Sequence, residues 1–260
     1  MDWIQAMILG IIQGLTEFLP ISSTGHLYLG RNLFGLNEAG LFLDTMLHLG
    51  TLIAVCLIYR EEIVTVIKNP FGHLSLVVIA GTLPTVVIAL LFEDFFEKLS
   101  ETGATLGWEF LVTGAILWFA DSVKNLGNKK LDDITFTDAL LIGTFQGAAI
   151  LPAISRSGIT IAAALFRGID KSTAAYFSFF LSIPAIAGAI FFQSTKLVSG
   201  TIESVSVEML IIATLASGIC GYIAVKWMIS ILKRGSLKIF SYYVWAVGVV
   251  ILLGQFTGRF

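Results

Sequence analysis

Residues 13–25 of the chain read QGLTEFLPISSTG and place a carboxylate, a proline and a run of hydroxyls inside an apolar N-terminal segment. The flanking residues are oily enough to lie in lipid. Backbone that leaves the helical path at membrane depth is tolerated only where it is buried in protein or lines a wet cavity. Segment 4–35 therefore predicts a re-entrant helical hairpin, in which two helices enter the membrane, break at Leu-Pro and return.

The composition is that of an integral membrane protein. Of the 260 residues, 56% are hydrophobic and only 13% are charged, whereas an average soluble domain has about 25% charged residues. The formal net charge of -2 and the scattered lysines and arginines exclude a basic surface for nucleic acid. Apolar stretches follow one another along the whole chain, so we expect one integral membrane domain, residues 1–260.

Six stretches are long enough and apolar enough to cross a hydrocarbon core about 30 Å thick. The predicted fold class is therefore an all-α polytopic membrane protein. Residues 134–168 are also apolar, but Leu-Pro and a hydroxyl-rich run break them in the middle, so they predict a second re-entrant hairpin. The six predicted transmembrane helices are residues 41–59, 74–92, 108–124, 172–192, 208–232 and 239–256.

The two interrupted segments resemble each other, which predicts an internal duplication. QGAAILPAISRSG starts at Gln146, 133 residues after Gln13, and the closing glycines Gly25 and Gly158 keep this offset. Each half holds one hairpin followed by three crossings. Because three is odd, the second half must insert upside down relative to the first, which predicts an inverted-topology repeat whose breaks meet near the middle of the membrane.

The distribution of lysine and arginine predicts the orientation of the two repeats, about 1–130 and 131–260. With the N-terminus outside, 11 of the 16 basic residues fall in inner loops and four in outer loops, while Arg156 lies in the second break. Cytoplasmic loops of membrane proteins carry such an excess of positive charge. We therefore expect both termini to lie outside.

The two breaks have a chemistry suited to phosphate. A helix that begins at a break aims unpaired backbone N–H groups at the cavity, and small hydroxyl residues and glycines add donors without bulk. Arg156 adds a planar guanidinium that can hold phosphate oxygens in a bidentate contact. An arginine in apolar sequence marks a functional site by default. The predicted substrate-binding residues are Gln13, Ser22, Thr24, Gly25, Ser155, Ser157 and Gly158.

Glu17, Ser23 and His26 supply what the cleavage of a phosphate ester requires. They are a carboxylate for a metal or a proton, a candidate nucleophile, and an imidazole that titrates near neutrality. If the chain is helical after the break, residues 23 and 26 share a face, and His26 could accept the proton of Ser23. The alternatives are a structural ion pair of Glu17 with Arg156 and packing roles for the small residues.

A second histidine, His48, lies in the motif LHLGT. We expect it to be a buried packing histidine or to support the site from behind, and a direct role is the alternative. Asp44 lies one turn before His48 and is spaced to pair with it.

QGLTEFLPISSTGH and LPAISRSG resemble the undecaprenyl-diphosphate phosphatase family, also called bacitracin-resistance proteins. FLDTMLHLGTLIAV at 42–55 and YFSFFLSIPAIAG at 176–188 are also similar to that family, so the resemblance covers essentially the whole chain. Many members have glutamate where this chain has Gln13, and the second motif usually has glycine where this chain has Ala153.

The resemblance implies hydrolysis of a C55 polyprenyl diphosphate to the monophosphate, which recycles the lipid carrier of cell-wall polymer synthesis and confers bacitracin resistance. It implies a multi-pass plasma-membrane protein whose site faces the outer side and uses a divalent cation, Mg²⁺ or Ca²⁺, held with Glu17. The family's catalytic residues fall on Glu17, Ser23, His26 and Arg156, and its motif glutamine or glutamate falls on Gln13.

A lipid-phosphate flippase or transporter is the rival function. Inverted repeats whose paired broken helices meet at mid-membrane are typical of transporters, but a flippase needs no nucleophile. A non-catalytic lipid-binding protein explains neither Glu17 nor His26. The sequence leaves open whether the chain forms a homodimer and whether the lipid is cleaved through a phosphoserine or by direct attack of water.

Overall fold

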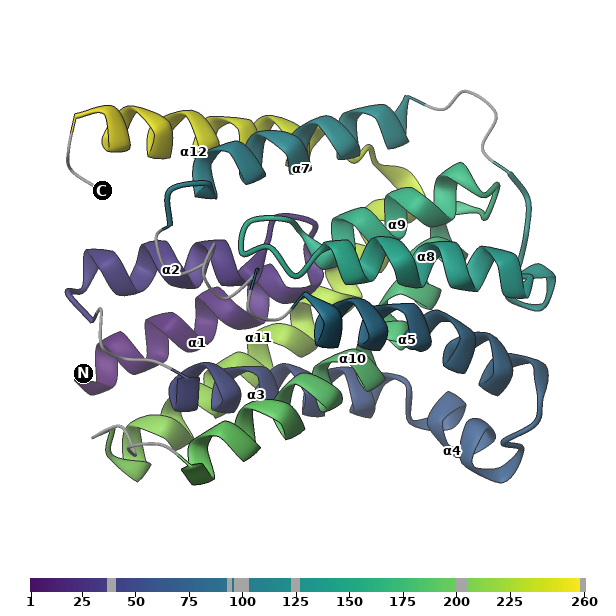
Figure 1. Ribbon diagram of the computed structural model, residues 1–260, viewed down its shortest axis with the longest axis horizontal. Coiled ribbons are helices and arrows are strands. Elements are labelled where there is room, and N and C mark those ends of the chain that lie inside the picture. The colour runs from purple at the N-terminus through teal and green to yellow at the C-terminus, as the bar shows by residue number, and fades with distance from the viewer. Residues whose placement is uncertain (37–40, 93–94, 96–102, 123–126, 200–204, 258–260) are drawn as a thin grey trace.

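The fold is all-helical, as the sequence predicts. The structure is a computed structural model that describes residues 1–36, 41–92, 95, 103–122, 127–199 and 205–257. Within these residues there is no β-strand, and an isolated bridge joins Lys129 to Ile169. The helices run roughly parallel or antiparallel to one long axis (Figure 1).

The described helices are as follows. They are α1 (Trp3–Phe18), α2 (Ser23–Leu33), α3 (Leu41–Ile58), α4 (Arg60–Lys68), α5 (His73–Leu91), α7 (Leu106–Asp121), α8 (Phe136–Ala148), α9 (Arg156–Phe166), α10 (Lys171–Ser199), α11 (Val207–Arg234) and α12 (Lys238–Phe256), with a short 3₁₀ turn at Leu131–Asp133.

Several of these helices can cross a membrane, which makes the chain a multi-pass membrane protein. Four described helices, α5, α10, α11 and α12, are long and apolar enough, and the pair α3 and α4, bent by 78°, is a fifth candidate. Each of the six predicted spans overlaps a helix, although residues 123 and 124 of the third span lie outside the described residues, and α7 has only 16 residues. At 1.5 Å per residue it is about 24 Å long, shorter than a typical hydrocarbon core.

Two pairs of antiparallel helices interrupt this pattern. In Figure 1 the pair α1 and α2 enters from the left end, while α8 and α9 enter from the right end, and their breaks lie near the middle. The interruptions fall at residues 19–22 and 149–155, where the sequence predicts them. Residues 19–22 and 152–155 are buried, so both breaks lie inside the molecule.

The first break follows from its proline and its capping serine. A residue before proline is pushed out of the helical region, and Leu19 is extended with ψ of 144°. Ser22 then caps α2 by accepting a hydrogen bond from the Gly25 N–H (3.3 Å), although its φ of +69° is in the left-handed region. Ser155 caps α9 in the same way, from the Gly158 N–H (3.1 Å).

Glycines let the first helix of each pair pack closely on a long helix of the other half. A side chain at Gly14 would lie 2.5 Å from the Ser217 carbonyl of α11, and one at Gly10 would meet the Ala213 carbonyl. In α8, a side chain at Gly143 would meet the Gly81 carbonyl of α5. Gly143 lies 133 residues after Gly10, so the same offset relates these contacts and the two breaks.

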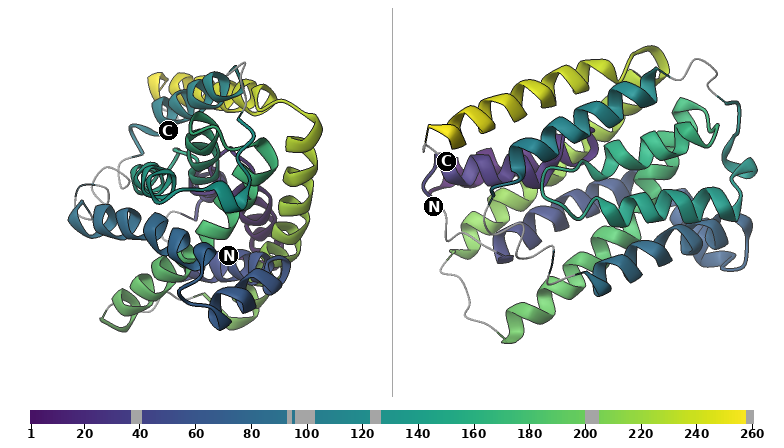
Figure 2. Two further views of the ribbon diagram at one scale, coloured as in Figure 1. Left: turned by 90° about the vertical axis from the view of Figure 1, so that its right-hand side faces the viewer. Right: turned by 45° about the horizontal axis from the view of Figure 1, so that its top comes forward.

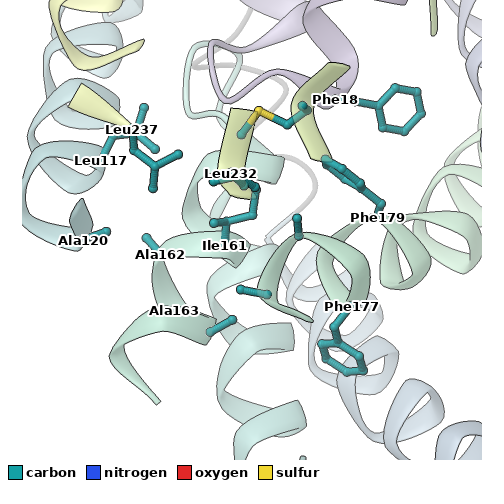
Figure 3. Packing of buried hydrophobic residues seen from close by; sticks show 14 of the residues in the cluster. Phe18, Leu117, Ala120, Ile161, Ala162, Ala163, Phe177, Phe179, Leu232 and Leu237 are labelled. Carbon is teal, nitrogen blue, oxygen red and sulfur yellow. The ribbon is translucent and has the colours of Figure 1, made fainter. Parts of the chain in front are cut away.

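The second helices of the two pairs differ in burial. Every residue from 157 to 165 in α9 is buried, and Figure 3 shows Ile161, Ala162 and Ala163 among the buried side chains of the core. In α2 only Ser23, Gly25, Leu27 and Gly30 are buried. The Phe18 ring packs edge-on against Phe179 at 5.7 Å between centroids.

We predict that Gly14→Ala lowers the thermal stability of the purified protein in detergent. The added methyl would overlap backbone and Cys220 atoms of α11, and such overpacking costs about 1–3 kcal/mol. Gly188→Ala is the matched control, because nothing lies within 4 Å of a side chain there, and alanine favours a helix. Equal melting temperatures for the two variants would contradict close packing of α1 on α11.

Candidate functional site

A small polar cavity lies where the two breaks meet. Its volume is about 110 Å³, well below the roughly 300–1,000 Å³ of pockets that enclose drug-sized ligands. It therefore suits a compact polar group and not a long chain. The residues that line it are Glu17, Ser22, Ser23, Thr24, His48, Ala149, Leu151, Ile154, Ser155 and Arg156.

Glu17 connects the two breaks through its carboxylate. One oxygen accepts from the Arg156 guanidinium across the site. The other accepts from the Ser23 hydroxyl and from Gln13 Nε2 (3.0 Å). Glu17 is only 6% exposed, and a buried charge that loses its partner is strongly destabilising. The ion pair of Glu17 with Arg156, expected from the sequence as the alternative to a chemical role, is present, and both residues line the cavity.

Arg156 and Ser23 occupy equivalent positions at the starts of α9 and α2. Each is the first residue of a helix that begins at a break, so each lies beside backbone N–H groups that carry the positive end of the helix dipole. Arg156 brings a guanidinium to this point and Ser23 brings a hydroxyl. Both side chains line the same cavity.

From the sequence we expect His26 to accept a proton from Ser23, but the two side chains form no hydrogen bond with each other. The stretch is helical, but His26 Nδ1 lies 2.6 Å from the Ser22 carbonyl and Nε2 lies 2.9 Å from the Tyr243 hydroxyl. The ring also stacks on Tyr243, with 5.7 Å between centroids. Since a carbonyl only accepts, Nδ1 carries the proton and Nε2 accepts from Tyr243. Ser23 donates to Glu17 instead, and His26 is not among the residues that line the cavity.

His48 is the histidine that the structure places at the cavity. Its Nε2 lies 3.9 Å from Glu17 Oε2, and its Nδ1 lies 2.8 Å from the Asp44 carbonyl. The Asp44 carboxylate pairs with Arg31 at 2.6 Å, so the expected pairing with His48 occurs through the backbone. The motif LHLGT made His48 a candidate, but only the packing of α3 beside α1 directs its ring toward Glu17.

Two of the predicted phosphate ligands join the breaks to each other. The Ser22 hydroxyl donates to the Pro152 carbonyl (2.5 Å), and the Ser157 hydroxyl donates to the Leu19 carbonyl (3.0 Å). Each serine therefore satisfies a backbone group of the opposite break. Ser22 still lines the cavity, whereas Ser157 does not.

The remaining predicted ligands divide into lining and supporting residues. Thr24 and Ser155 line the cavity, and Thr24 is exposed. Gln13 is fully buried behind Glu17, and a side chain at Gly25 would press on the Phe110 ring. Gly158 uses its N–H for the Ser155 cap. The site is thus supported from outside the cavity lining by Gln13, Gly25 and Gly158.

The side chains at the cavity do not form a resident metal site by themselves. Among the described residues no group of three or more His, Cys, Asp or Glu side chains could hold a metal ion. Glu17 is the one carboxylate among the lining residues, and both of its oxygens already accept hydrogen bonds. Mg²⁺ usually binds through one or two carboxylates together with substrate phosphates and water. A cation here would therefore need oxygens from a bound phosphate.

The family comparison agrees with this arrangement of residues. The family model described as "Bacitracin resistance protein BacA" matches residues 6–250. The chain belongs to the BacA family. The resemblance read from the two break motifs is thereby confirmed, and the residues that carried it are those at the centre of the site.

Relatives of this BacA-family chain match it over its full length. "Undecaprenyl-diphosphatase 3" of Bacillus cereus is 64% identical over 100% of both chains. "Undecaprenyl-diphosphatase" of Carboxydothermus hydrogenoformans is 50% identical, again over 100% of both. "Undecaprenyl-diphosphatase" of Halothermothrix orenii is 42% identical over 97% of this chain and 98% of its own.

We predict that Ser157→Ala destabilises the BacA-family chain. The substitution removes the Ser157 hydrogen bond to the Leu19 carbonyl, which keeps only its bond from the Ile21 N–H (2.8 Å), and the loss of one such buried hydrogen bond costs about 0.5–1.5 kcal/mol. Ser194→Ala is the control, since this exposed hydroxyl bonds within its own helix. Thermal unfolding in detergent would measure both, and a melting point for Ser157→Ala equal to that of the control would exclude a cross-break role.

Proposed function

We propose that this chain hydrolyses undecaprenyl diphosphate, or a polyprenyl diphosphate like it, to the monophosphate and inorganic phosphate. The full-length relatives named undecaprenyl-diphosphatase support this activity. The observation that carries it is the meeting of Glu17, Ser23 and Arg156 in one cavity. The reaction recycles the lipid carrier of cell-wall polymer synthesis and accounts for the bacitracin resistance in the family's name.

The cavity accepts the diphosphate and leaves the isoprenoid tail in the membrane. Its volume of about 110 Å³ is far too small for a C55 chain. Burial of a lipid chain is worth roughly 0.8 kcal/mol per CH₂ removed from water, but most of that is already gained in the bilayer. Selectivity therefore comes mainly from the head group, through Arg156 and the donors at the two helix starts.

The reaction begins when the substrate's terminal phosphate displaces Glu17 as the partner of Arg156. The Ser23 oxygen, or a water held by it, attacks the terminal phosphorus, and the proton passes to Glu17, which already accepts from Ser23. The bond to the bridging oxygen breaks, and the lipid monophosphate leaves. If Ser23 attacks, water then cleaves the phosphoserine. Arg156 stabilises the charge on the transferring phosphoryl oxygens.

The two histidines have different places in this scheme. For His26 to take the Ser23 proton, its ring would have to leave Tyr243 and the Ser22 carbonyl. We therefore assign His26 chiefly to holding the Ser22 turn that shapes the site. His48 faces Glu17 from the cavity wall and is placed to stabilise the Glu17 carboxylate.

We propose that a divalent cation, Mg²⁺ or Ca²⁺, binds together with the substrate. Glu17 would contribute its carboxylate and the diphosphate would contribute oxygens, which are the ligands that these ions prefer. The cation would supply positive charge beside the phosphoryl group. Gln13 donates to Glu17 and orients the carboxylate.

We propose a plasma-membrane topology of six crossings and two re-entrant pairs in inverted repeats, about 1–130 and 131–260. Three observations support it: the helix pairs enter from opposite ends (Figure 1), α1 packs on α11 as α8 packs on α5, and the glycines at these contacts share one offset. The excess of basic residues in the inner loops favours termini outside. The substrate would then enter from the outer side.

A flippase is the second candidate function, because opposed broken helix pairs are also the architecture of transporters. A flippase would bind the lipid phosphate at Arg156 but would not need the Ser23 hydroxyl beside a carboxylate. The Ser23 contact with Glu17 therefore favours the phosphatase.

We predict that Ser23→Ala and Arg156→Lys each lower phosphate release from undecaprenyl diphosphate by roughly 100-fold or more, because each removes a group that acts on the transferring phosphoryl group. Lysine keeps the charge but cannot form the bidentate contact. The measurement is phosphate release by purified protein in detergent, with Ser194→Ala as the control. Near wild-type rates would refute these roles, and no release by folded wild type would favour the flippase.

We predict that stoichiometric binding of Mn²⁺, as a spectroscopic stand-in for Mg²⁺, requires a diphosphate ligand. The described side chains offer one carboxylate at the cavity, so the free protein should bind the ion weakly. Electron paramagnetic resonance with and without methylene diphosphonate would measure this. Glu17→Gln should remove the ligand-dependent binding, and chelator should stop phosphate release. Tight binding of Mn²⁺ to the free protein would contradict the proposal.

A further inference from the structure

Helix α7 holds the backbone of the second break from outside the cavity. The Ala153 N–H donates to Glu109 Oε2 (2.7 Å), and the Thr113 hydroxyl donates to the Ala153 carbonyl (2.9 Å). Thr113 also accepts from the Ser155 N–H (3.2 Å). Two side chains one turn apart on α7 thus bind three backbone polar groups of the break.

The contacts of Glu109 suit a carboxylate. Glu109 is 5% exposed, and its second oxygen accepts from the Thr105 hydroxyl (2.6 Å). Two donors therefore converge on it, and an ionised carboxylate accepts from both, whereas an amide could accept from only one of them and would have to donate to the Thr105 hydroxyl. Burying a carboxylate is costly unless its hydrogen bonds are made. A role in packing alone would not need the charge.

We propose that Glu109, together with Thr113, is a positioning residue that holds Arg156 at the cavity. Ser155 is the residue before α9 and Arg156 is its first residue. The hydrogen bonds to Ala153 and Ser155 therefore set where α9 begins and the direction in which the guanidinium leaves the backbone. Glu109 itself is not among the residues that line the cavity. The inference rests on the proposed function, in which Arg156 holds the substrate phosphate.

Helix α12 supports the first break in a comparable way, but without a carboxylate. Its Tyr243 hydroxyl bonds to His26, which bonds in turn to the Ser22 carbonyl. Helices α7 and α12 lie side by side (Figures 1 and 2), and the Trp245 indole of α12 donates to the Leu111 carbonyl of α7 (3.0 Å). The two supports therefore form one unit, and only the support on the Arg156 side has an acidic group.

The test compares Glu109→Gln and Thr113→Val with a matched control, Thr214→Val. Thr214 of α11 also donates to a carbonyl of a neighbouring helix, Met46 of α3 (3.1 Å), so its loss removes the same kind of contact between residues that belong to neither break. We expect roughly 10- to 100-fold slower phosphate release for the two α7 variants, as for a catalytic group displaced by about 1 Å, and near wild-type release for the control. Equal rates for all three variants would overturn the proposal.

A double-mutant cycle separates positioning from a general structural effect. With Arg156→Ala as background, Glu109→Gln and Thr113→Val should cause no further loss, because there is no guanidinium left to misplace. Losses that multiply in the double variants would overturn the proposal. Thr113→Val keeps all charges and decides the matter if Glu109→Gln does not fold. If Arg156→Ala itself matches wild type, the proposed function of the site fails, and that outcome is distinct from a failure of Glu109 alone.

Discussion

The buried ion pair of Glu17 with Arg156 is the interaction on which the arrangement of the two halves depends. The two residues lie 139 positions apart in the chain and come from opposite breaks. Neither charge can be left alone in a membrane interior without a large cost. Their pairing therefore requires both breaks to meet. It holds the Arg156 guanidinium beside the Glu17 carboxylate, which can accept a proton, until an anionic head group competes for the arginine.

The broken backbone sets the second constraint. A helix that ends inside a membrane leaves polar groups without partners, and here they are satisfied reciprocally. Ser22 and Ser157 donate to carbonyls of the opposite break, while Ser155 is held by Thr113 of α7. Many polar groups of the two breaks therefore have partners within the protein. The donors that face the cavity remain available to a phosphate. The same contacts that make the fold possible thus prepare the site.

The two broken helix pairs differ in what they contribute. Helix α9 is buried along nearly its whole length, while α2 buries one face. The first helix pair carries Glu17 and Ser23, and the buried helix α9 of the second pair carries Arg156 at its start. A buried helix is the better place for a charge that must bind and orient, because its supporting hydrogen bonds are shielded from water. An exposed Thr24 and a less buried α2 leave room for a lipid head group to enter.

The sequence by itself determined the membrane class, the helical breaks and most of the residues around the cavity, because hydropathy and Leu-Pro followed by a capping serine act locally. It also pointed to Glu17, Ser23 and Arg156, since charged and polar side chains are expensive in apolar sequence.

Only the tertiary structure decided that Ser23 donates to Glu17, that His48 rather than His26 faces the cavity, and that Glu109 supports the second break. Helical spacing places residues 23 and 26 on one face. It does not predict that both imidazole nitrogens of His26 form hydrogen bonds elsewhere, one to the Ser22 carbonyl and one to the Tyr243 hydroxyl. Contacts between residues far apart in the chain depend on how helices pack, and one chain's local pattern does not contain that information.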